Sequence, residues 1–206
     1  MKTTYFFIIA LCVNLLQFNV LIAQEWTLAK QKNEVSVYTR FIEGWSIKEY
    51  KAVFKVRSEL EQVIKVLKDI KGRINWLYNT IEVKPVGEQG KDKICFYSQY
   101  HAPWPVSNRD NITIFHFRNV NEKIIRIEME CIPSLPNVPE IDGLVRIKEL
   151  KGHWIIKDLG NGMIEVIQQC VADPGGSLPD WLANSSVVDS PYNSMLSLKK
   201  IIEKAN

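Results

Sequence analysis

Apolar and charged residues alternate along most of the chain, and this pattern restricts the possible fold more than any other feature. In the stretch Ile125-Arg126-Ile127-Glu128-Met129-Glu130-Cys131, apolar side chains fall on one face and charged side chains on the other. In Lys48–Val56, one face carries Tyr50, Ala52, Phe54 and Val56, and the other carries Glu49, Lys51 and Lys55. Such strands are typical of an antiparallel sheet with one face in water and one face covered.

The same reading predicts seven further strands. They are Trp26–Lys32, Glu34–Phe41, Thr80–Gly87, Lys93–Tyr100, Asn111–Asn119, Arg146–Asp158 with a break, and Met163–Ala172. Glycine-containing turns such as Glu88-Gln89-Gly90 and Gly160-Asn161-Gly162 separate some of them.

Two segments depart from the alternation and predict helices. Ser58–Ile70 has an apolar stripe, with Ser58 as the expected cap and Glu61 completing a capping box. The second helix starts at the Ser177-x-x-Asp180 signal, and Pro191 should kink it or split it after Asp189. The order of elements predicts an α+β protein, in which a curved antiparallel sheet wraps around a long C-terminal helix and leaves an internal apolar cavity.

The first 23 residues are typical of a secretory signal peptide. Lys2 provides a positive charge, Tyr5–Phe18 is mainly apolar, and Ala23 ends a small-residue cleavage site. We therefore expect an exported protein, periplasmic or secreted, whose mature domain spans residues 24–206. Retention of the segment as an anchor stays open.

The remaining composition excludes several functions. A formal charge of +3 over 206 residues gives no indication of nucleic-acid binding. Cys95, Cys131 and Cys170 follow the signal segment, and because three is odd at least one thiol is unpaired; whether two of them pair stays open. The histidines are scattered without metal-site spacing, and no nucleophile or phosphate-loop motif occurs, so we expect neither a metal nor a cofactor.

Several stretches resemble the START (StAR-related lipid-transfer) family. They are Trp26 with Val35–Arg40, Trp76, Pro103-Trp104-Pro105-Val106-Ser107-Asn108-Arg109-Asp110, Gly152-His153-Trp154, and Asp173-Pro174-Gly175-Gly176-Ser177-Leu178-Pro179-Asp180-Trp181-Leu182. The resemblance covers almost all of residues 24–206. It implies a helix-grip fold with an internal tunnel that holds one lipid, without covalent chemistry or metal. Some sterol-binding members have an arginine where this chain has Phe115, so the resemblance favours a sterol less than another apolar guest.

The resemblance and the parity of the strands together predict the residues that contact the ligand. Arg109 is expected to bond backbone groups before a ligand, although its guanidinium suits a phosphate at the tunnel mouth. Trp104 is expected on a movable flap that touches a membrane surface transiently. The full predicted set is Tyr50, Phe54, Phe96, Ser98, Tyr100, Trp104, Arg109, Thr113, Phe115, Ile127, Met129, Trp181, Tyr192 and Met195.

We expect a monomer that binds or transfers a lipid or another hydrophobic small molecule outside the cytoplasm, without catalysis. One alternative is a cyclase or hydrolase on the same scaffold, for which Tyr100 and His101 are the nearest acid–base candidates. Another is an interaction protein with a filled or empty interior. The fold alone does not separate these three functions.

Overall fold

The computed structural model describes residues 25–176, 178 and 180–205, except the side chains of residues 180–182, 184 and 185. The strands are β1 (Thr27–Lys32), β2 (Val35–Arg40), β3 (Glu49–Arg57), β4 (Thr80–Pro85), β5 (Lys93–Tyr100), β6 (Arg109–Asn121), β7 (Ile124–Cys131), β8 (Val145–Arg146), β9 (Glu149–Gly160) and β10 (Met163–Asp173). The helices are α1 (Leu60–Lys68), the short 3₁₀ helix η1 (Lys71–Asn75) and α2 (Asp180–Lys204).

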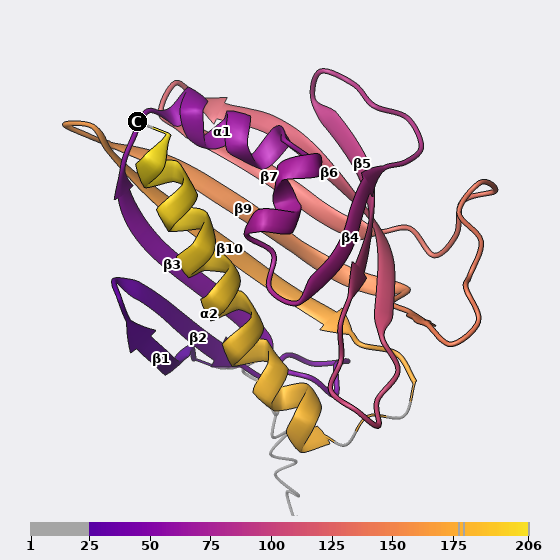
Figure 1. The fold of residues 1–206 in the computed structure, drawn as a ribbon. Coiled ribbons are helices and arrows are strands. Elements are labelled where there is room, and N and C mark those ends of the chain that lie inside the picture. The colour runs from indigo at the N-terminus through magenta and orange to yellow at the C-terminus, as the bar shows by residue number, and fades with distance from the viewer. Residues whose placement is uncertain (1–24, 177, 179, 206) are drawn as a thin grey trace, which may run out of the picture.

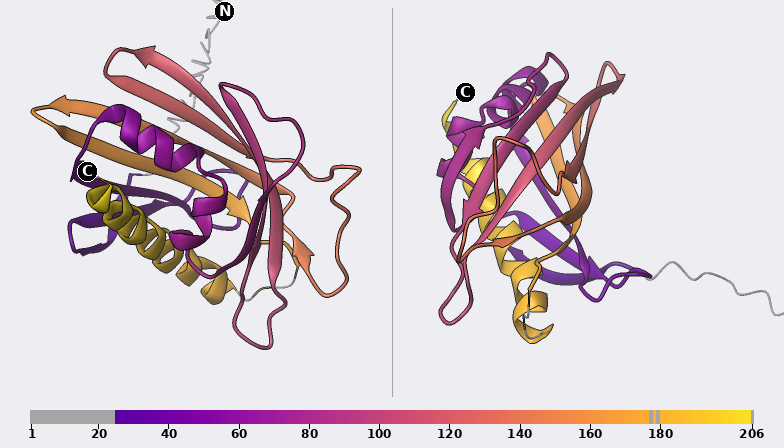
Figure 2. Two further views of the ribbon diagram at one scale, coloured as in Figure 1. Left: turned by 45° about the horizontal axis from the view of Figure 1, so that its top comes forward. Right: turned by 90° about the vertical axis from the view of Figure 1, so that its right-hand side faces the viewer.

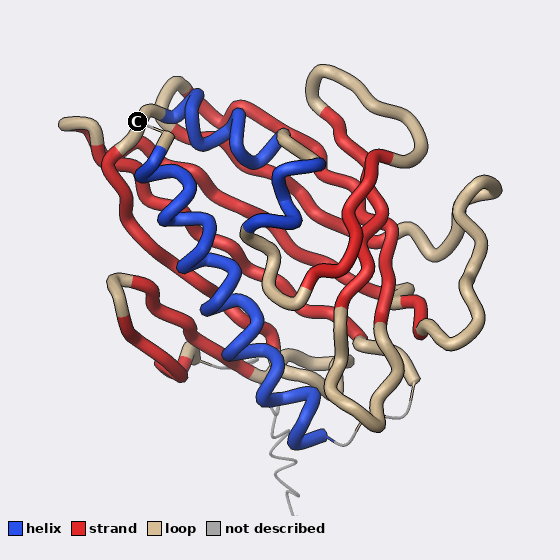
Figure 3. Tube along the Cα trace, viewed as in Figure 1, coloured by secondary structure: helices blue, strands red, loops and turns tan. Residues whose placement is uncertain are grey.

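One curved sheet forms the body of the molecule. Its strand order is β1-β2-β3-β10-β9-β7-β6-β5-β4, with antiparallel neighbours throughout, and β8 pairs in parallel with β6 outside this path. Helix α2 crosses the sheet on the same side as α1 and η1 (Figures 1 and 3). The two further views show the sheet curving around α2 (Figure 2). The predicted α+β helix-grip architecture is confirmed.

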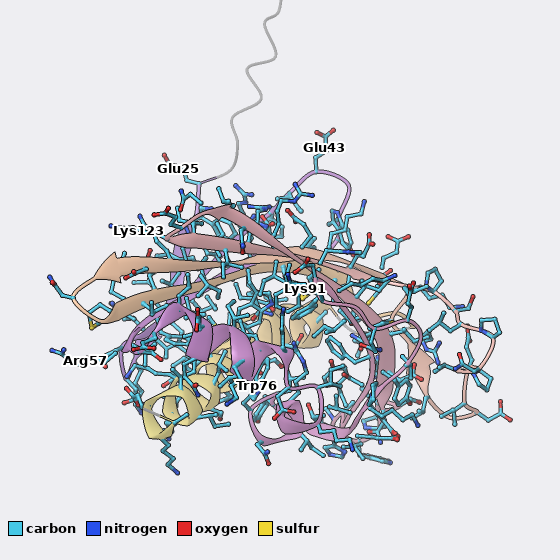
Figure 4. The ribbon with its side chains drawn as sticks, turned by 90° about the horizontal axis from the view of Figure 1, so that it is seen from above. Glu25, Glu43, Arg57, Trp76, Lys91 and Lys123 are labelled. Atoms are coloured by element: carbon cyan, nitrogen blue, oxygen red, sulfur yellow. The ribbon has the colours of Figure 1, made fainter. Side chains whose placement is uncertain are left out.

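Alternation of side chains explains which face of the sheet is covered. The largest core cluster includes Val37, Phe54, Phe115, Ile127 and Ile156 from the strands, together with Met195, Leu198 and Ile202 from α2. Burial of these side chains between α2 and the sheet supplies the main stabilisation, because each large apolar side chain contributes about 1.5–3 kcal/mol when fully buried. Figure 4, seen from above, shows Trp76 on the helix side of the sheet.

Gly152 permits a close approach within this sheet. A Cβ atom at this position would lie 2.4 Å from the carbonyl oxygen of Gln169 and 2.8 Å from the Met129 Cε atom. Only glycine fits there, because real Cβ atoms do not come so close to a backbone oxygen. The wall of the interior formed by β7, β9 and β10 therefore depends on the missing side chain.

Both helices differ in detail from the sequence predictions. The N-cap of α1 is Glu59, not Ser58, and it makes no side-chain capping bond. The N–H of Ser58 donates instead to the Gly162 carbonyl at 3.0 Å, which keeps Ser58 with the end of β3. Helix α2 continues through Pro191, so the predicted split after Asp189 is wrong, and the alternative of a kink at this residue stays a prediction. Ser177, the predicted cap of this helix, lies outside the described residues.

A second apolar cluster lies on the outer face of the sheet and is centred on Cys95, Tyr97, Ile112 and Val138. Beside it, Arg146 donates two hydrogen bonds to the Asp110 carboxylate at 2.7 and 3.0 Å, and both side chains are 1% exposed. Arg146 lies 36 residues from Asp110 in the chain, and nothing in the sequence indicates this pairing.

Cys95, Cys131 and Cys170 are all free thiols in the structure. Desolvation raises the pKa of each, that of Cys131 to about 12. No helix in the described part of the chain is long and apolar enough to cross a membrane.

Candidate ligand-binding cavity

A cavity of about 280 Å³ lies between the sheet and helix α2. Apolar and aromatic side chains dominate its lining, among them Ile47, Trp76, Phe96, Phe115, Leu150 and Trp154. Phe96 and Phe115 pack edge to face with centroids 5.2 Å apart, and Trp76 and Trp154 do the same at 6.2 Å. Rigid aromatic walls of this kind suit a hydrophobic ligand.

Helix α2 and four connecting segments contribute to one side of the cavity. Ser186, Val187, Ser190, Pro191 and Ser194 contribute from α2, and Lys48, Tyr78, Asn79, His101 and Pro174 contribute from the connections. The backbone N–H of Tyr78 donates to the Ser194 hydroxyl at 3.0 Å, which ties the segment after η1 to the helix. The cavity is therefore bounded partly by loops and partly by a helix that enters through a glycine-containing turn.

The guanidinium of Arg73 forms part of the cavity wall. Arg73 belongs to η1, is 1% exposed, and lies over the rings of Phe96 and Phe115 at 4.3 and 4.4 Å from their centroids. One terminal nitrogen donates to the Leu67 carbonyl, whereas Nε has no partner among the described residues. Burial lowers the pKa of Arg73 to about 9, so the group is still charged at neutral pH.

Arg73 has no ion pair with a carboxylate in the described part of the chain. Asp69 is the acidic residue whose charge acts on it, and an oxygen of Asp69 accepts a hydrogen bond from the Gly72 N–H at 3.0 Å. Ring faces attract a cation, but they do not use its N–H groups. The cavity thus contains a desolvated positive charge with hydrogen-bonding capacity that the protein does not fill.

Polar side chains from β5 and β6 form a recess beside this charge, defined here as Ser98, Tyr100 and Asn111. Ser98 and Asn111 are directly opposite each other in the β5–β6 ladder. Both are buried, and both side chains lie against the Tyr100 phenol. Burial raises the pKa of Tyr100, whereas hydrogen bonds with the Ser98 and Asn111 side chains and the charge of Arg73 lower it.

Desolvation also shifts the pKa values of other titratable groups in the cavity. Tyr50 and Cys170 are partners in the β3–β10 ladder, and burial raises the pKa of both. Each therefore stays protonated and neutral at physiological pH. None of the described residues form a cluster of metal ligands.

The structure divides the predicted ligand contacts into two main groups. Six of them line the cavity: Tyr50, Phe96, Tyr100, Thr113, Phe115 and Met129. Five others are buried in or beside the surrounding core: Phe54, Ser98, Ile127, Tyr192 and Met195. Direct contact between any of these side chains and a ligand stays a prediction.

The three remaining predicted residues lie elsewhere. Arg109 donates to the carbonyls of Ser107, Pro174 and Gly175, which confirms its expected pairing with backbone groups. It thereby holds the turn between β10 and α2 against the start of β6. Trp104 is 92% exposed in the β5–β6 loop and does not line the cavity. Trp181 is in α2, but its side chain lies outside the described residues.

Sequence reasoning missed Arg73, the most unusual group in the cavity. Lys71-Gly72-Arg73 has the appearance of a solvated turn after an amphipathic helix. The available signal was Trp76 three residues later, because a large ring that close to a turn requires the segment to pack inward. Asn111 was also missed, although its parity is that of the predicted Thr113 and Phe115.

A curved sheet that grips a C-terminal helix and encloses an apolar cavity defines a helix-grip protein suited to a hydrophobic ligand. The model of the START domain matches residues 16–194. The chain therefore belongs to the START domain family, a family of lipid-transfer domains, and the resemblance noted in the sequence is confirmed.

Individual relatives agree with this assignment. An uncharacterised protein of Pseudomonas aeruginosa is 32% identical over 183 residues, which cover 89% of each chain. The phosphatidylcholine transfer protein of Rattus norvegicus is 27% identical and matches 82% of this chain and 79% of its own length. The crystal structure of a STAR-related lipid transfer protein from Xanthomonas axonopodis has 30% identity and a TM-score of 0.78, and covers 86% of this chain and 98% of that chain.

Proposed function

We propose that this protein binds and carries a lipid with an anionic head group, which Arg73 recognises. The observation that carries the proposal is the charge of Arg73 in the wall of an apolar cavity, without a carboxylate partner in the described part of the chain. A buried charge is costly unless it is paired, and a guanidinium matches the geometry of phosphate and carboxylate groups. An anionic head group would supply the missing partner.

The apolar lining supports binding of the lipid's hydrocarbon. Each methylene moved from water into an apolar site contributes about 0.8 kcal/mol, so about ten methylenes suffice for useful affinity. The present cavity of about 280 Å³ is slightly smaller than the range of about 300–1,000 Å³ that is usual for ligand sites. We therefore expect the mouth and the N-terminal half of α2 to move outward when a long acyl chain enters.

The ionisation of the cavity residues argues for binding without catalysis. A general base or nucleophile needs a pKa near the working pH. Burial moves the pKa values of Tyr50, Tyr100 and Cys170 upward, away from neutrality. His101, the other acid–base candidate, lines the cavity but has an exposed side chain. A cyclase or hydrolase function is therefore less well supported than binding without catalysis.

The names of the relatives support a transfer role, since one is a phosphatidylcholine transfer protein and another a STAR-related lipid transfer protein. We further propose that the chain acts as a monomer outside the cytoplasm after cleavage behind Ala23, and that it touches membranes transiently through Trp104. The proposal of export and cleavage rests on the N-terminal sequence pattern, and that of membrane contact rests on the exposure of the indole.

Uptake of lipid by an Arg73→Met variant tests the proposed function. Purified protein is incubated with phosphatidylglycerol vesicles, reisolated and analysed by native mass spectrometry. We expect Arg73→Met to lower uptake at least tenfold, since the variant keeps the length of the side chain but removes the charge. Arg118→Met, a change at an exposed arginine of β6, is the matched control and should stay within twofold of the wild type.

Diacylglycerol vesicles complete the experiment, because this lipid has acyl chains but no charge. Arg73→Met should retain its uptake, which shows that the cavity is intact. Equal uptake of phosphatidylglycerol by Arg73→Met and the unchanged protein would refute recognition of an anion by Arg73.

A further inference from the structure

The side chain of Gln168 in β10 is turned into the cavity. Its partners across the sheet are Ala52 in β3 and Trp154 in β9, both fully buried. Gln168 itself is 8% exposed and lines the cavity. The adjacent Gln169 points to the outer face, where its amide donates to the Glu49 carboxylate at 2.7 Å. Alternation along β10 therefore gives two neighbouring glutamines opposite surroundings.

The Gln168 amide makes no hydrogen bond with any of the described residues. The unpaired indole nitrogens of Trp76 and Trp154 are fully enclosed by protein, whereas the amide of Gln168 keeps contact with the cavity. An amide has a carbonyl oxygen that accepts hydrogen bonds and an NH₂ group that donates them. Burial of such a group against hydrocarbon is unfavourable unless these bonds are made. A ligand can therefore provide the partner that the described part of the chain does not.

Gln168 and the Arg73 guanidinium lie at different places along the cavity. Arg73 lies over the Phe115 ring in β6, 4.4 Å from its centroid, and strands β9 and β7 separate β10 from β6. Three strand spacings of about 4.8 Å correspond to about 14 Å along the sheet. Trp154, which packs edge to face against Trp76, occupies part of this distance. A ligand that meets both groups has an anion and a second polar group joined by an apolar segment.

The surroundings of Gln168 indicate the chemistry of this second group. Ala52 and Trp154 flank the amide, and burial of an ionised group there is far more costly than burial of a neutral one. A hydroxyl group both donates and accepts, so it can satisfy the NH₂ group and the carbonyl oxygen of the amide together. An ester carbonyl only accepts, and in a phospholipid it lies close to the phosphate. A hydroxyl within the hydrocarbon chain is therefore the better match.

We propose that the ligand is an anionic lipid with a hydroxyl group in the middle of its acyl chain, and that Gln168 binds this hydroxyl. The proposal rests on the proposed function, in which Arg73 holds the anion. An unsubstituted chain leaves the Gln168 amide against hydrocarbon, whereas a mid-chain hydroxyl makes the missing hydrogen bonds. Gln168 is thus a specificity-determining residue, and the substrate class is hydroxylated acyl lipids.

Three fatty acids of equal length test this preference in the unchanged protein. They are octadecanoate, its derivative hydroxylated at the twelfth carbon, and its derivative hydroxylated beside the carboxylate. Dissociation constants are measured by isothermal titration calorimetry with protein freed of co-purified lipid. The mid-chain hydroxy acid should bind at least fivefold more tightly than octadecanoate. The hydroxyl beside the carboxylate should change the affinity less than twofold, because it lies far from Gln168.

A substitution at Gln168 connects the preference to this residue. Gln168→Met removes the hydrogen-bonding groups but keeps an unbranched side chain that packs in apolar surroundings. It should reduce the preference for the mid-chain hydroxy acid to less than twofold. Gln169→Met, the same exchange on the outer face, is the matched control and should leave the preference unchanged. If Gln168→Met does not fold, the three acids still decide the proposal in the unchanged protein.

The outcomes separate this inference from the proposed function. Equal affinity for octadecanoate and the mid-chain hydroxy acid overturns the inference, and so does a preference that persists in folded Gln168→Met. Failure to bind any of the three acids also overturns it, while uptake of phosphatidylglycerol still decides the proposed function. Arg73→Met should weaken the binding of all three acids alike. An intact hydroxyl preference with no effect of Arg73→Met would support the role of Gln168 and refute anion recognition by Arg73.

Discussion

The Arg73 guanidinium lies 4.4 Å from the centroid of the Phe115 ring and thereby joins the short helix η1 to strand β6. The resemblance to the START family also shows a departure, because some sterol-binding members have an arginine at the position of Phe115. Here the cation comes from a different element and lies on the ring that occupies that position. The site is therefore cationic even though β6 itself contributes only Phe115 at this point.

The first prediction is that Arg73→Met stabilises the protein when no lipid is present. Burial disfavours the charged arginine, as its lowered pKa indicates, and replacement of buried charges by apolar groups is often neutral or stabilising. We expect the free energy of unfolding in urea to rise by about 1 kcal/mol. Arg118→Met serves as the exposed control. A loss of 2 kcal/mol or more would show that Arg73 is mainly a structural residue.

A second prediction concerns a carboxylate placed against Arg73. Phe115→Asp removes a buried ring and destabilises the protein, but the new carboxylate faces the guanidinium and pairs with it. Phe115→Asp should therefore lower the free energy of unfolding less in the protein that retains Arg73 than in the Arg73→Met variant. We expect a difference of about 1–3 kcal/mol in a double-mutant cycle. Phosphatidylglycerol uptake should fall in the single variant, because Arg73 is neutralised.

Additive effects in that cycle would contradict the contact between positions 73 and 115. Lys55→Asp, at an exposed residue of β3, provides the reference for a surface charge change. Its uptake of phosphatidylglycerol should remain normal.

The strands could be predicted from the sequence because alternation directly reports which side chains face the core. For β5 the predicted bounds, Lys93 to Tyr100, are those observed, and the parity of Phe96 and Phe115 placed both rings in the cavity wall. Each of these inferences depends on residues two positions apart in one strand.

Features that depend on distant segments were not predictable in this way. Arg73 is buried only because η1 packs beneath β5 and β6, and nothing within Lys71–Asn75 indicates that contact. Ser58 has the composition of a helix cap, yet its N–H is bonded to Gly162, about a hundred residues along the chain. Asp110 similarly finds Arg146 through the pairing of β6 with β8.

A third prediction is that affinity for an anionic lipid falls as the pH rises through about 9. The free protein holds the pKa of Arg73 near 9, and a bound anion favours the charged form, so binding is strongest where Arg73 is protonated. Affinity for phosphatidylglycerol should be constant between pH 7 and 8 and decrease at least threefold by pH 10. Diacylglycerol binding measured in parallel should not change, and the decrease should be absent in Arg73→Met.

A fourth prediction concerns processing. Lys2, the apolar run and Ala23 predict cleavage that leaves Gln24 as the first residue. N-terminal sequencing of protein recovered from the periplasm or the medium should find Gln24, or a residue within two positions of it. Met1 on the exported protein would contradict cleavage and favour an anchored form.

The last prediction concerns Trp104, which is 92% exposed although it is one of the largest apolar side chains in the protein. The loop that carries it is ordered by two hydrogen bonds, from the Ala102 N–H to the Asn108 side chain at 3.0 Å and from the Val106 N–H to the Pro103 carbonyl at 2.9 Å. It follows His101, which lines the mouth of the cavity. An exposed indole on such a loop partitions readily into a membrane interface.

Trp104→Ala should therefore slow lipid exchange between vesicles at least threefold while changing the free energy of unfolding by no more than about 0.5 kcal/mol, as expected for an exposed site. Val120→Ala removes an exposed apolar side chain in the β6–β7 hairpin region, away from the cavity lining, and should affect neither quantity. Exchange is measured with a fluorescent phospholipid, and stability by urea unfolding. If Trp104→Ala exchanges lipid at the normal rate, the indole has no part in membrane contact, and a loss of several kcal/mol would assign it a packing role instead.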